Sequence, residues 1–185
     1  MKKSETESEL ETQKQELIAA LKACGAVRYG DFTLASGKKS KYYIDIKKAS
    51  TDPKTLKLIA QQAAFRIKQM DVDIVAGVEL GGVPLATAVS LETELPLLIV
   101  RKAVKDYGTK SRFVGDIKPE NRLVMLEDVT TSGGSVRDAI DVIRETGANV
   151  KYVISVVDRE EGAKENLNKA GTELIPLVSA SDLLK

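Results

Sequence analysis

Hydrophobic positions in the first part of the chain recur at the spacing of a helix. Apolar residues follow this spacing from Leu10 to Leu21, and the pattern stops at Cys24-Gly25, where a glycine suits a helix end. A second helical pattern begins at Pro53, directly after Asp52, which can cap a helix, and continues to about Met70. The sequence therefore predicts two amphipathic helices, one around residues 10–21 and one from Pro53 to about Met70.

Between these helices the chain carries short runs of β-type residues. Phe32-Thr-Leu-Ala35 and Tyr42-Tyr-Ile-Asp45 are separated by the turn-forming segment Ser36-Gly-Lys-Lys-Ser40. Two such runs around a turn predict a small antiparallel unit between Val27 and Asp45.

Beyond these segments, strand and helix patterns alternate. The predicted strands are continuous apolar runs at 73–77, 96–100, 123–126 and 152–157, and the predicted helices lie at 83–92, 135–146 and 162–170. Continuous apolar strands joined by helices are typical of a parallel sheet covered on both faces. We therefore predict the α/β class, with a parallel twisted sheet flanked by helices and the antiparallel unit as a small N-terminal hood.

Length and charge favour one domain without a large charged surface. We expect residues 1–48 to form the first helix and the hood, and residues 49–185 to form the sheet core of a single domain. The 28 Lys and Arg nearly balance the 27 Asp and Glu, so overall charge attracts neither nucleic acid nor an acidic membrane. Any anion site must be local.

Composition also removes several classes of enzyme. The chain has no histidine, which excludes a His-based catalytic triad and a His-containing zinc site, and its single cysteine, Cys24, cannot form an internal disulfide. The polar N-terminus lacks an apolar signal core, and no run approaches the roughly 18 apolar residues that suggest a membrane span. We expect a cytoplasmic protein.

The stretch from Val124 to Val136 places two acids next to hydroxyls and glycines. An apolar run ends at Glu127-Asp128, and a segment rich in Thr, Ser and Gly follows at a predicted strand end, where helix N-termini favour anions. Gly133-Gly134 lets the backbone approach a ligand closely, and the neighbouring hydroxyls can donate hydrogen bonds, which together indicate a cradle for one phosphate. No Walker lysine follows, so a nucleoside triphosphate site is not expected.

The acid pair must face something other than the phosphate. Carboxylates beside an anion suit hydroxyl donors or a magnesium ion with its waters, and a ribose 5-phosphate supplies hydroxyls and phosphate together. The simpler alternative is an ordinary capped helix after an exposed acid.

This stretch resembles the PRPP-binding motif of the type I phosphoribosyltransferases. Within that family, three further stretches are similar to the orotate phosphoribosyltransferases: Phe32 to Tyr43 resembles their hood, Arg101-Lys102 with Lys105 their mobile catalytic loop, and Asp158-Arg159 the end of their last core strand. The likeness runs from about residue 10 to the C-terminus.

The resemblance implies a site for each substrate. The implied PRPP-binding residues are Glu127, Asp128, Val129, Thr130, Thr131, Ser132, Gly133, Gly134, Ser135, Arg101, Lys102, Lys105 and Tyr107. Arg101, Lys102 and Lys105 are the implied catalytic residues, because charge develops on the leaving pyrophosphate. Thr131 and Arg159 are implied to hold orotate, whose planar carboxylate suits a guanidinium. Taken alone, Arg159 would be a surface ion-pair residue and 101–116 a solvated basic loop.

The implied reaction converts orotate and PRPP into orotidine 5-phosphate and pyrophosphate in UMP biosynthesis. The resemblance also implies magnesium carried by PRPP with no direct protein ligand, and a homodimer in which loop 101–116 is shared across subunits. Neither a nucleic-acid nor a membrane partner is expected. Two alternatives are a phosphoribosyltransferase for another nucleobase and a PRPP-responsive regulator that binds nucleic acid.

Glycines after the first core strand form a further candidate, because Gly81-Gly82 could bring backbone N-H groups to the pyrophosphate. A plain strand-to-helix turn would have the same sequence. The resemblance departs from the well-known bacterial enzymes at three positions where those carry a cation and this chain has Ala35, Gly81 and Tyr107. The sequence does not identify the cations that replace them.

Overall fold

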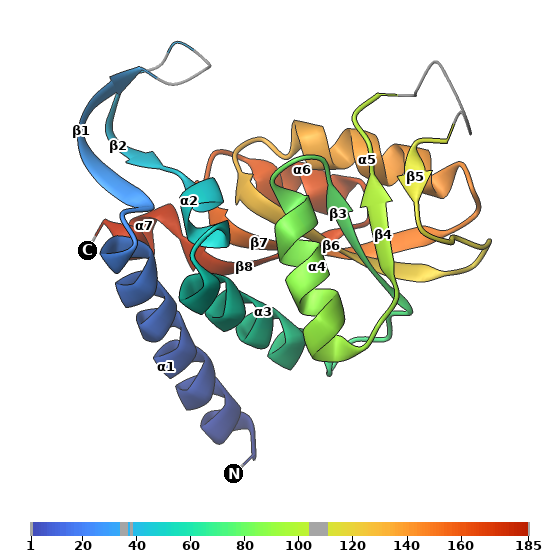
Figure 1. Cartoon of the computed structure of the whole chain (residues 1–185), viewed down its shortest axis with the longest axis horizontal. Coiled ribbons are helices and arrows are strands. Elements are labelled where there is room, and N and C mark those ends of the chain that lie inside the picture. Colours follow the sequence, from blue (N-terminus) through green and yellow to red (C-terminus); the bar gives the residue numbers. More distant parts are fainter. Residues whose placement is uncertain (1, 34–36, 38, 104–110, 185) are drawn as a thin grey trace.

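The computed structural model describes residues 2–33, 37, 39–103 and 111–184 (Figure 1). Its core is a six-stranded sheet in the order β5-β4-β3-β6-β7-β8. Neighbouring strands are parallel except β4 and the two-residue β5, which are antiparallel. The strands are β3 (Ile74–Val78), β4 (Leu97–Val100), β5 (Phe113–Val114), β6 (Arg122–Thr130), β7 (Asn149–Asp158) and β8 (Glu173–Ser179). The predicted α/β class with a parallel sheet is confirmed.

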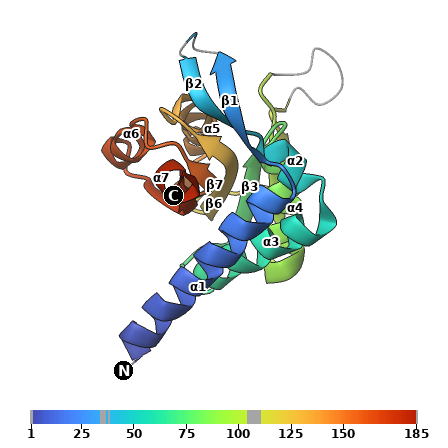
Figure 2. The same ribbon diagram turned by 90° about the vertical axis from the view of Figure 1, so that its left-hand side faces the viewer.

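Helices cover both faces of this sheet (Figure 2). The helices are α1 (Lys2–Ala23), α2 (Ile46–Ser50), α3 (Pro53–Ile67), α4 (Gly82–Thr93), α5 (Gly134–Arg144), α6 (Ala163–Lys169) and α7 (Ala180–Leu183). One apolar cluster packs α1, α3 and α4 against the sheet, and a second packs α5 and α6 against the other face. Within the described ranges, none of these helices combines the length and apolar character that a membrane crossing requires.

The helix boundaries follow local chemistry. The Asp52 carboxylate accepts hydrogen bonds from the backbone N-H of Thr55 at 2.8 Å and from its hydroxyl at 2.6 Å, and Pro53 occupies the first helical position of α3. The predicted cap is therefore confirmed. Helix α1 begins at Lys2, well before the apolar periodicity that starts at Leu10.

The hood is the predicted antiparallel pair, formed by β1 (Val27–Thr33) and β2 (Lys39–Ile44). The Tyr29 hydroxyl donates to the carbonyl oxygen of Leu183 in α7 at 3.1 Å, so the hood is attached to the C-terminal helix. Sequence analysis missed α7 and β8. Pro176 lies in β8, which pairs only with β7, and an edge strand can accommodate a proline because one of its sides needs no ladder hydrogen bonds.

The strand order determines where a ligand can bind. Strand β3 has β4 on one side and β6 on the other, so the chain reverses its direction across the sheet between β3 and β6. Such a reversal leaves a crevice at the carboxyl ends of the two strands. Loops after Val78 and Thr130 therefore open onto the same edge of the sheet.

Strand β6 is longer than the predicted 123–126. It continues through the acid pair because β7 supplies partners along its whole length, with Glu127 opposite Ser155 and Thr130 opposite Asp158. Successive strand residues start toward opposite faces of a sheet, yet the Asp128 carboxylate stays close enough to Glu127 to raise the pKa of Glu127. The expectation that the strand ends at the acids is wrong.

At the opposite edge of the sheet, Arg122 and Asp73 form a paired contact. Arg122 Nη2 and Nε donate to Asp73 Oδ1 and Oδ2 at 2.6 and 3.0 Å, and the backbone N-H of Arg122 donates to Oδ2 at 2.9 Å. Arg122 also pairs with Asp71. The hydrogen bonds from Arg122 lower the pKa of Asp73 to about 2.

We predict that Asp73→Asn lowers the free energy of unfolding at pH 7 and that this difference disappears in acid. The folded-state pKa lies below the unfolded value, so the stabilisation is present above about pH 4 and is lost as the pH falls toward 2. Urea unfolding of both proteins across this range measures the effect. The exposed Asp116→Asn is the control, and a deficit of the same size at pH 2 and pH 7 would contradict the pairing.

Candidate active site

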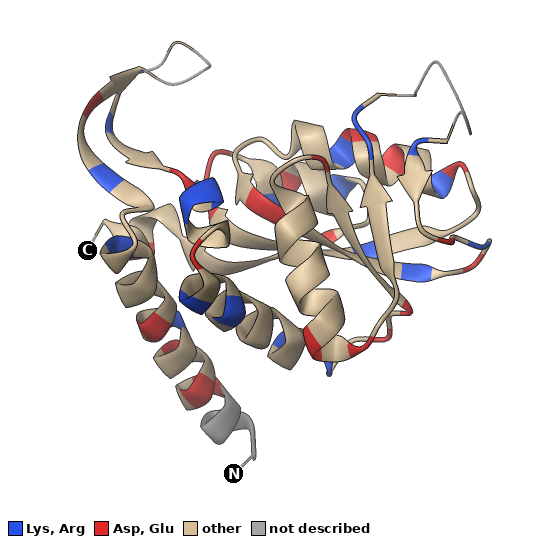
Figure 3. Cartoon of the chain, in the orientation of Figure 1, with Lys and Arg blue, Asp and Glu red and all other residues tan. Residues whose placement is uncertain are grey.

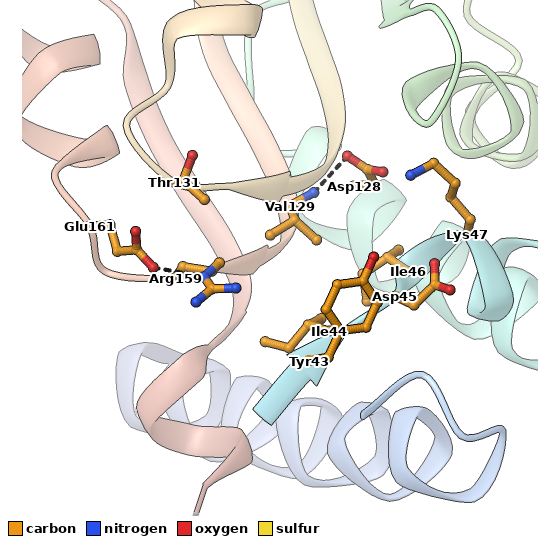
Figure 4. A pocket seen from close by; sticks show the side chains of 10 residues that line it. All are labelled: Tyr43, Ile44, Asp45, Ile46, Lys47, Asp128, Val129, Thr131, Arg159 and Glu161. Atoms are coloured by element: carbon orange, nitrogen blue, oxygen red, sulfur yellow. Dashed lines mark hydrogen bonds and ion pairs between the residues drawn. The ribbon is translucent and has the colours of Figure 1, made fainter. Parts of the chain in front are cut away.

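A cavity of about 360 Å³ lies between the hood and the carboxyl ends of β6 and β7 (Figure 4). Three segments supply its walls: the end of β2 with the start of α2, the end of β6, and the loop after β7. The lining residues are Tyr43, Ile44, Asp45, Ile46, Lys47, Asp128, Val129, Thr131, Arg159 and Glu161. The cavity thus brings the predicted residues Asp128, Thr131 and Arg159 together.

A second cavity of about 80 Å³ is the predicted phosphate cradle. Its walls are Glu127, Val129, Thr130, Thr131, Ser132, Gly133, Gly134, Ser135 and Val136. Gly133 has φ of +80°, and a Cβ there would lie 3.4 Å from the Leu167 side chain, so the turn into α5 requires glycine. The first N-H groups of α5 have no partner within the helix and can bind an anion.

The two cavities share a wall, because Val129 and Thr131 line both. The acid pair is divided between them. Glu127 lines the cradle and Asp128 lines the larger cavity, as expected for neighbouring residues on a strand. A ligand that reaches from one cavity to the other would pass both carboxylates.

The Glu127 carboxylate is in an unfavourable environment. Its Oε2 is buried and has no hydrogen-bond partner among the described residues, although other parts of the residue reach the surface. Burial, followed by the charge of Asp128, raises the pKa of Glu127 to about 8. A ligand hydroxyl that donates to this oxygen would relieve the cost.

Glycines after β3 bring the neighbouring loop against the acid pair. A Cβ at Gly81 would collide with the Asp128 carboxylate, and one at Gly82 would lie 2.6 Å from the Leu126 carbonyl oxygen. The loop can approach β6 this closely only because these residues lack side chains. This packing is a structural reason for the glycines, in addition to the predicted contact with pyrophosphate.

The stem of the cationic loop is described on both sides. The Arg112 guanidinium donates to the Arg101 carbonyl oxygen at 3.0 and 3.1 Å, and the backbone N-H of Arg101 donates to the Arg112 carbonyl oxygen at 2.8 Å. The backbone N-H of Lys102 donates to Glu79 Oε2 at 3.3 Å, which places Lys102 beside the loop after β3. Lys105 and Tyr107, like Ala35 of the hood, lie outside the described residues.

Arg159 is held at the end of β7 by its backbone and its side chain. Its N-H donates to the Thr130 carbonyl oxygen at 2.9 Å, and its Nε donates to Glu161 Oε1 at 2.8 Å. The guanidinium lies over the Tyr42 ring, 5.2 Å from the ring centre. The alternative of an exposed surface ion pair does not fit, because the Arg159 side chain is largely buried.

Six lining residues were not predicted as site residues: Tyr43, Ile44, Asp45, Ile46, Lys47 and Glu161. The Lys47 ammonium points toward Asp128 (Figure 4), and its charge lowers the pKa of Glu127, although burial outweighs it. Lys47 belongs to α2, whose five residues are too few to produce a recognisable periodicity. Figure 3 shows Lys and Arg interspersed with Asp and Glu along the ribbon, so the near balance of the two signs is local as well as overall.

Comparisons with known proteins agree on one family. The sequence profile of the phosphoribosyl transferase domain matches residues 47–175. The chain is 86% identical to the orotate phosphoribosyltransferase of Methanosarcina mazei, over 98% of this chain and 97% of that protein. Among solved structures, orotate phosphoribosyltransferase from Aeropyrum pernix is similar with a TM-score of 0.79 and 31% identity, covering 91% of this chain and 96% of that one. The Mycobacterium tuberculosis orotate phosphoribosyltransferase in complex with PRPP has a TM-score of 0.78 and 27% identity, covering 94% and 99%.

We predict that Glu127→Gln stabilises the ligand-free protein in alkaline but not in acidic solution. The folded-state pKa of about 8 lies above the ordinary 4.5, so stability falls as the pH rises between these values and the full cost is present above about pH 8. The neutral amide avoids this cost. Melting temperatures at pH 4 and pH 8.5 measure it, with the exposed Glu165→Gln as control, and an equal shift at both pH values would contradict the buried charge.

Proposed function

The chain belongs to the orotate phosphoribosyltransferases, and we propose that the two adjoining cavities are where it transfers the ribose 5-phosphate of PRPP to orotate. The products are orotidine 5-phosphate and pyrophosphate, and the reaction is a pentosyl transfer of pyrimidine biosynthesis. The observation that carries the assignment is the wall shared by the cavities: Val129 and Thr131 separate a phosphate cradle from a pocket with a guanidinium.

In this proposal PRPP spans the wall. Its 5-phosphate accepts hydrogen bonds from the N-H groups at the start of α5 and from the hydroxyls of Thr131, Ser132 and Ser135. Its ribose hydroxyls donate to Glu127 and Asp128. The unpartnered Oε2 of Glu127 supports this placement, because a hydroxyl would satisfy an acceptor that the protein leaves open.

Orotate occupies the larger cavity, beside Thr131 and Arg159. Its carboxylate meets the Arg159 guanidinium, and its ring faces the place where the ribose C1 lies. Holding the nucleophilic nitrogen and C1 in line removes much of the entropic barrier, so no covalent nucleophile is needed. This agrees with a chain that has no histidine.

Stabilisation of the leaving pyrophosphate falls to cations on the other side of the acid pair. Arg101, Lys102 and Lys105 are the proposed catalytic residues, with Tyr107 as a further contact. Lys102 is held beside Glu79, and Lys47 approaches Asp128 from α2 (Figure 4). We propose that Lys47 also contacts PRPP, on the side where Gly81 offers no cation.

Magnesium is proposed as the cofactor, brought in by PRPP with no direct protein ligand. The donor set fits this arrangement, since the paired carboxylates Glu127 and Asp128 suit ribose hydroxyls and the waters of a hydrated ion. The bound ion would neutralise part of the pyrophosphate charge. The residues that this chain contributes are the two acids and the cations of the loop stem.

A homodimer that shares loop 101–116 between subunits is also proposed, in the cytoplasm. Its support is that neither Arg101 nor Lys102 lines either of the two cavities of its own subunit, although the charge of Lys102 does lower the pKa of Glu127. The two strands that carry this stem, β4 and β5, lie at the far side of the sheet from β7 and Arg159. A loop anchored there can complete a neighbouring site.

We predict that Arg159→Ala raises the KM for orotate at least about tenfold, since the carboxylate loses a charge-assisted partner, while the KM for PRPP changes little. Spectrophotometric assay of orotate consumption with PRPP and magnesium measures both. Arg137→Ala, a charge-matched change on the exposed surface of α5, is the control. An unchanged KM for orotate in Arg159→Ala would show that orotate does not bind beside Arg159.

We also predict that Lys47→Ala raises the KM for PRPP by about three- to tenfold and leaves the KM for orotate within about twofold, because the lost ammonium faces the PRPP side of Asp128. Lys48→Ala is a matched control, since Lys48 is adjacent on the same helix but its ammonium approaches Gly25. An equal rise in the KM for PRPP in both variants would show that Lys47 makes no specific contact with PRPP and that only the overall positive charge of α2 affects PRPP binding.

A further inference from the structure

Glu161 is a negatively charged residue in the pocket proposed to bind the negatively charged orotate. It is an acid that lines a cavity proposed to take an anionic base, so on charge alone it should repel the substrate. Removing a repelling acid would improve binding. Its contact with Arg159 gives it a different role.

The Arg159 guanidinium is contacted along one edge and on one face. Arg159 Nε donates to Glu161 Oε1 at 2.8 Å, and the Tyr42 ring lies under the guanidinium with its centre 5.2 Å from Cζ. The Arg159 side chain is only 9% exposed, whereas that of Glu161 is 32% exposed. The carboxylate therefore keeps solvent contact while it orders an arginine that is nearly enclosed.

The segment that carries both residues is itself anchored. Asp158 accepts from the Thr130 hydroxyl at 2.9 Å, and Glu160 accepts from the backbone N-H and hydroxyl of Ser181 at 3.0 and 3.1 Å. The N-H of Ala163 donates to the Thr131 carbonyl oxygen at 3.0 Å. Because hydrogen bonds fix the residues before and after Glu161, its backbone is held in place. Its carboxylate can therefore restrict the orientation of the Arg159 guanidinium.

We propose that Glu161 is a positioning residue for orotate, acting through Arg159 with Tyr42 as the second support. This inference rests on the proposed function, in which Arg159 binds the orotate carboxylate. With Nε engaged by Glu161, the two terminal nitrogens, Nη1 and Nη2, are left for the substrate. The orotate carboxylate then binds end-on across these nitrogens, in the plane that Tyr42 sets.

Positioning and repulsion predict opposite signs for the same substitution. If Glu161 orients Arg159, Glu161→Ala frees a long side chain that must be ordered again whenever orotate binds, and the KM for orotate rises. If Glu161 merely adds negative charge to the pocket, Glu161→Ala lowers that KM. The KM for PRPP stays unchanged under positioning, because none of the proposed PRPP contacts involves Arg159 or Glu161.

The experiment compares Glu161→Ala, Glu161→Gln and Arg159→Ala with the unaltered enzyme, using orotate and PRPP with magnesium. We expect Glu161→Ala to raise the KM for orotate about tenfold, and Glu161→Gln, which retains an oxygen acceptor for Nε, to recover most of the loss. Glu165→Ala removes the same charge from the exposed surface of α6 and should leave both KM values unchanged. Melting temperatures show whether each variant is folded.

Two further readouts separate positioning from a general structural effect. The ¹⁵N resonance of Arg159 Nε, assigned by its loss in Arg159→Ala, should shift in Glu161→Ala and in no Glu165 variant. Tyr42→Leu should raise the KM for orotate, whereas Tyr42→Phe, which keeps the ring, should not.

The outcomes distinguish this inference from the function on which it rests. If Arg159→Ala raises the KM for orotate and Glu161→Ala lowers it or leaves it unchanged, the positioning role is wrong and the orotate pocket stands. If neither substitution changes the KM for orotate, the pocket assignment itself is wrong. Equal loss in Glu161→Ala and Glu161→Gln would also overturn the inference, because the retained acceptor should help.

Discussion

The pairing of β6 with β7 as far as Thr130 and Asp158 is the constraint on which the site depends. Each of these strands leads into one part of the proposed site: the cradle residues follow Thr130, and Arg159 follows Asp158. The buried hydrogen bond between the Thr130 hydroxyl and Asp158 and the bond from the Arg159 N-H to Thr130 lock the two ends together. The spacing between the cradle and Arg159 is therefore set by the pairing of the two strands and not by flexible loops.

Several polar groups at the ends of these strands lack hydrogen-bond partners within the described part of the protein. The Oε2 atom of Glu127 is buried near a second acid, and helix α5 begins nearby with N-H groups that have no partner within the helix. Each of these groups lacks what a sugar phosphate supplies, since the acid accepts hydroxyls and the amides donate to phosphate. These unsatisfied groups lower the stability of the folded protein, and binding of a sugar phosphate would satisfy them. Such a cost in stability at a functional site is common.

Periodicity and motif spacing were sufficient for the architecture and for the residues that lie on regular elements. The acid pair and the cradle were predicted because they follow a strongly apolar strand, whereas Arg159 was predicted only from the resemblance to the family. Lys47 and Glu161 were not predicted, since a five-residue helix and a loop acid produce no pattern in one sequence. β8 was also missed, because Pro176 interrupts its apolar run and only the position of β8 at the sheet edge makes a proline acceptable.

The bond between Tyr29 and Leu183 joins residues 154 positions apart, near opposite ends of the chain. A contact of that separation forms only after the intervening polypeptide has been made and has closed a long loop. During synthesis on the ribosome, the hood emerges early but cannot dock until α7 has followed it. The hood, which forms one wall of the larger cavity, thus gains this attachment only after all strands of the sheet have been synthesised.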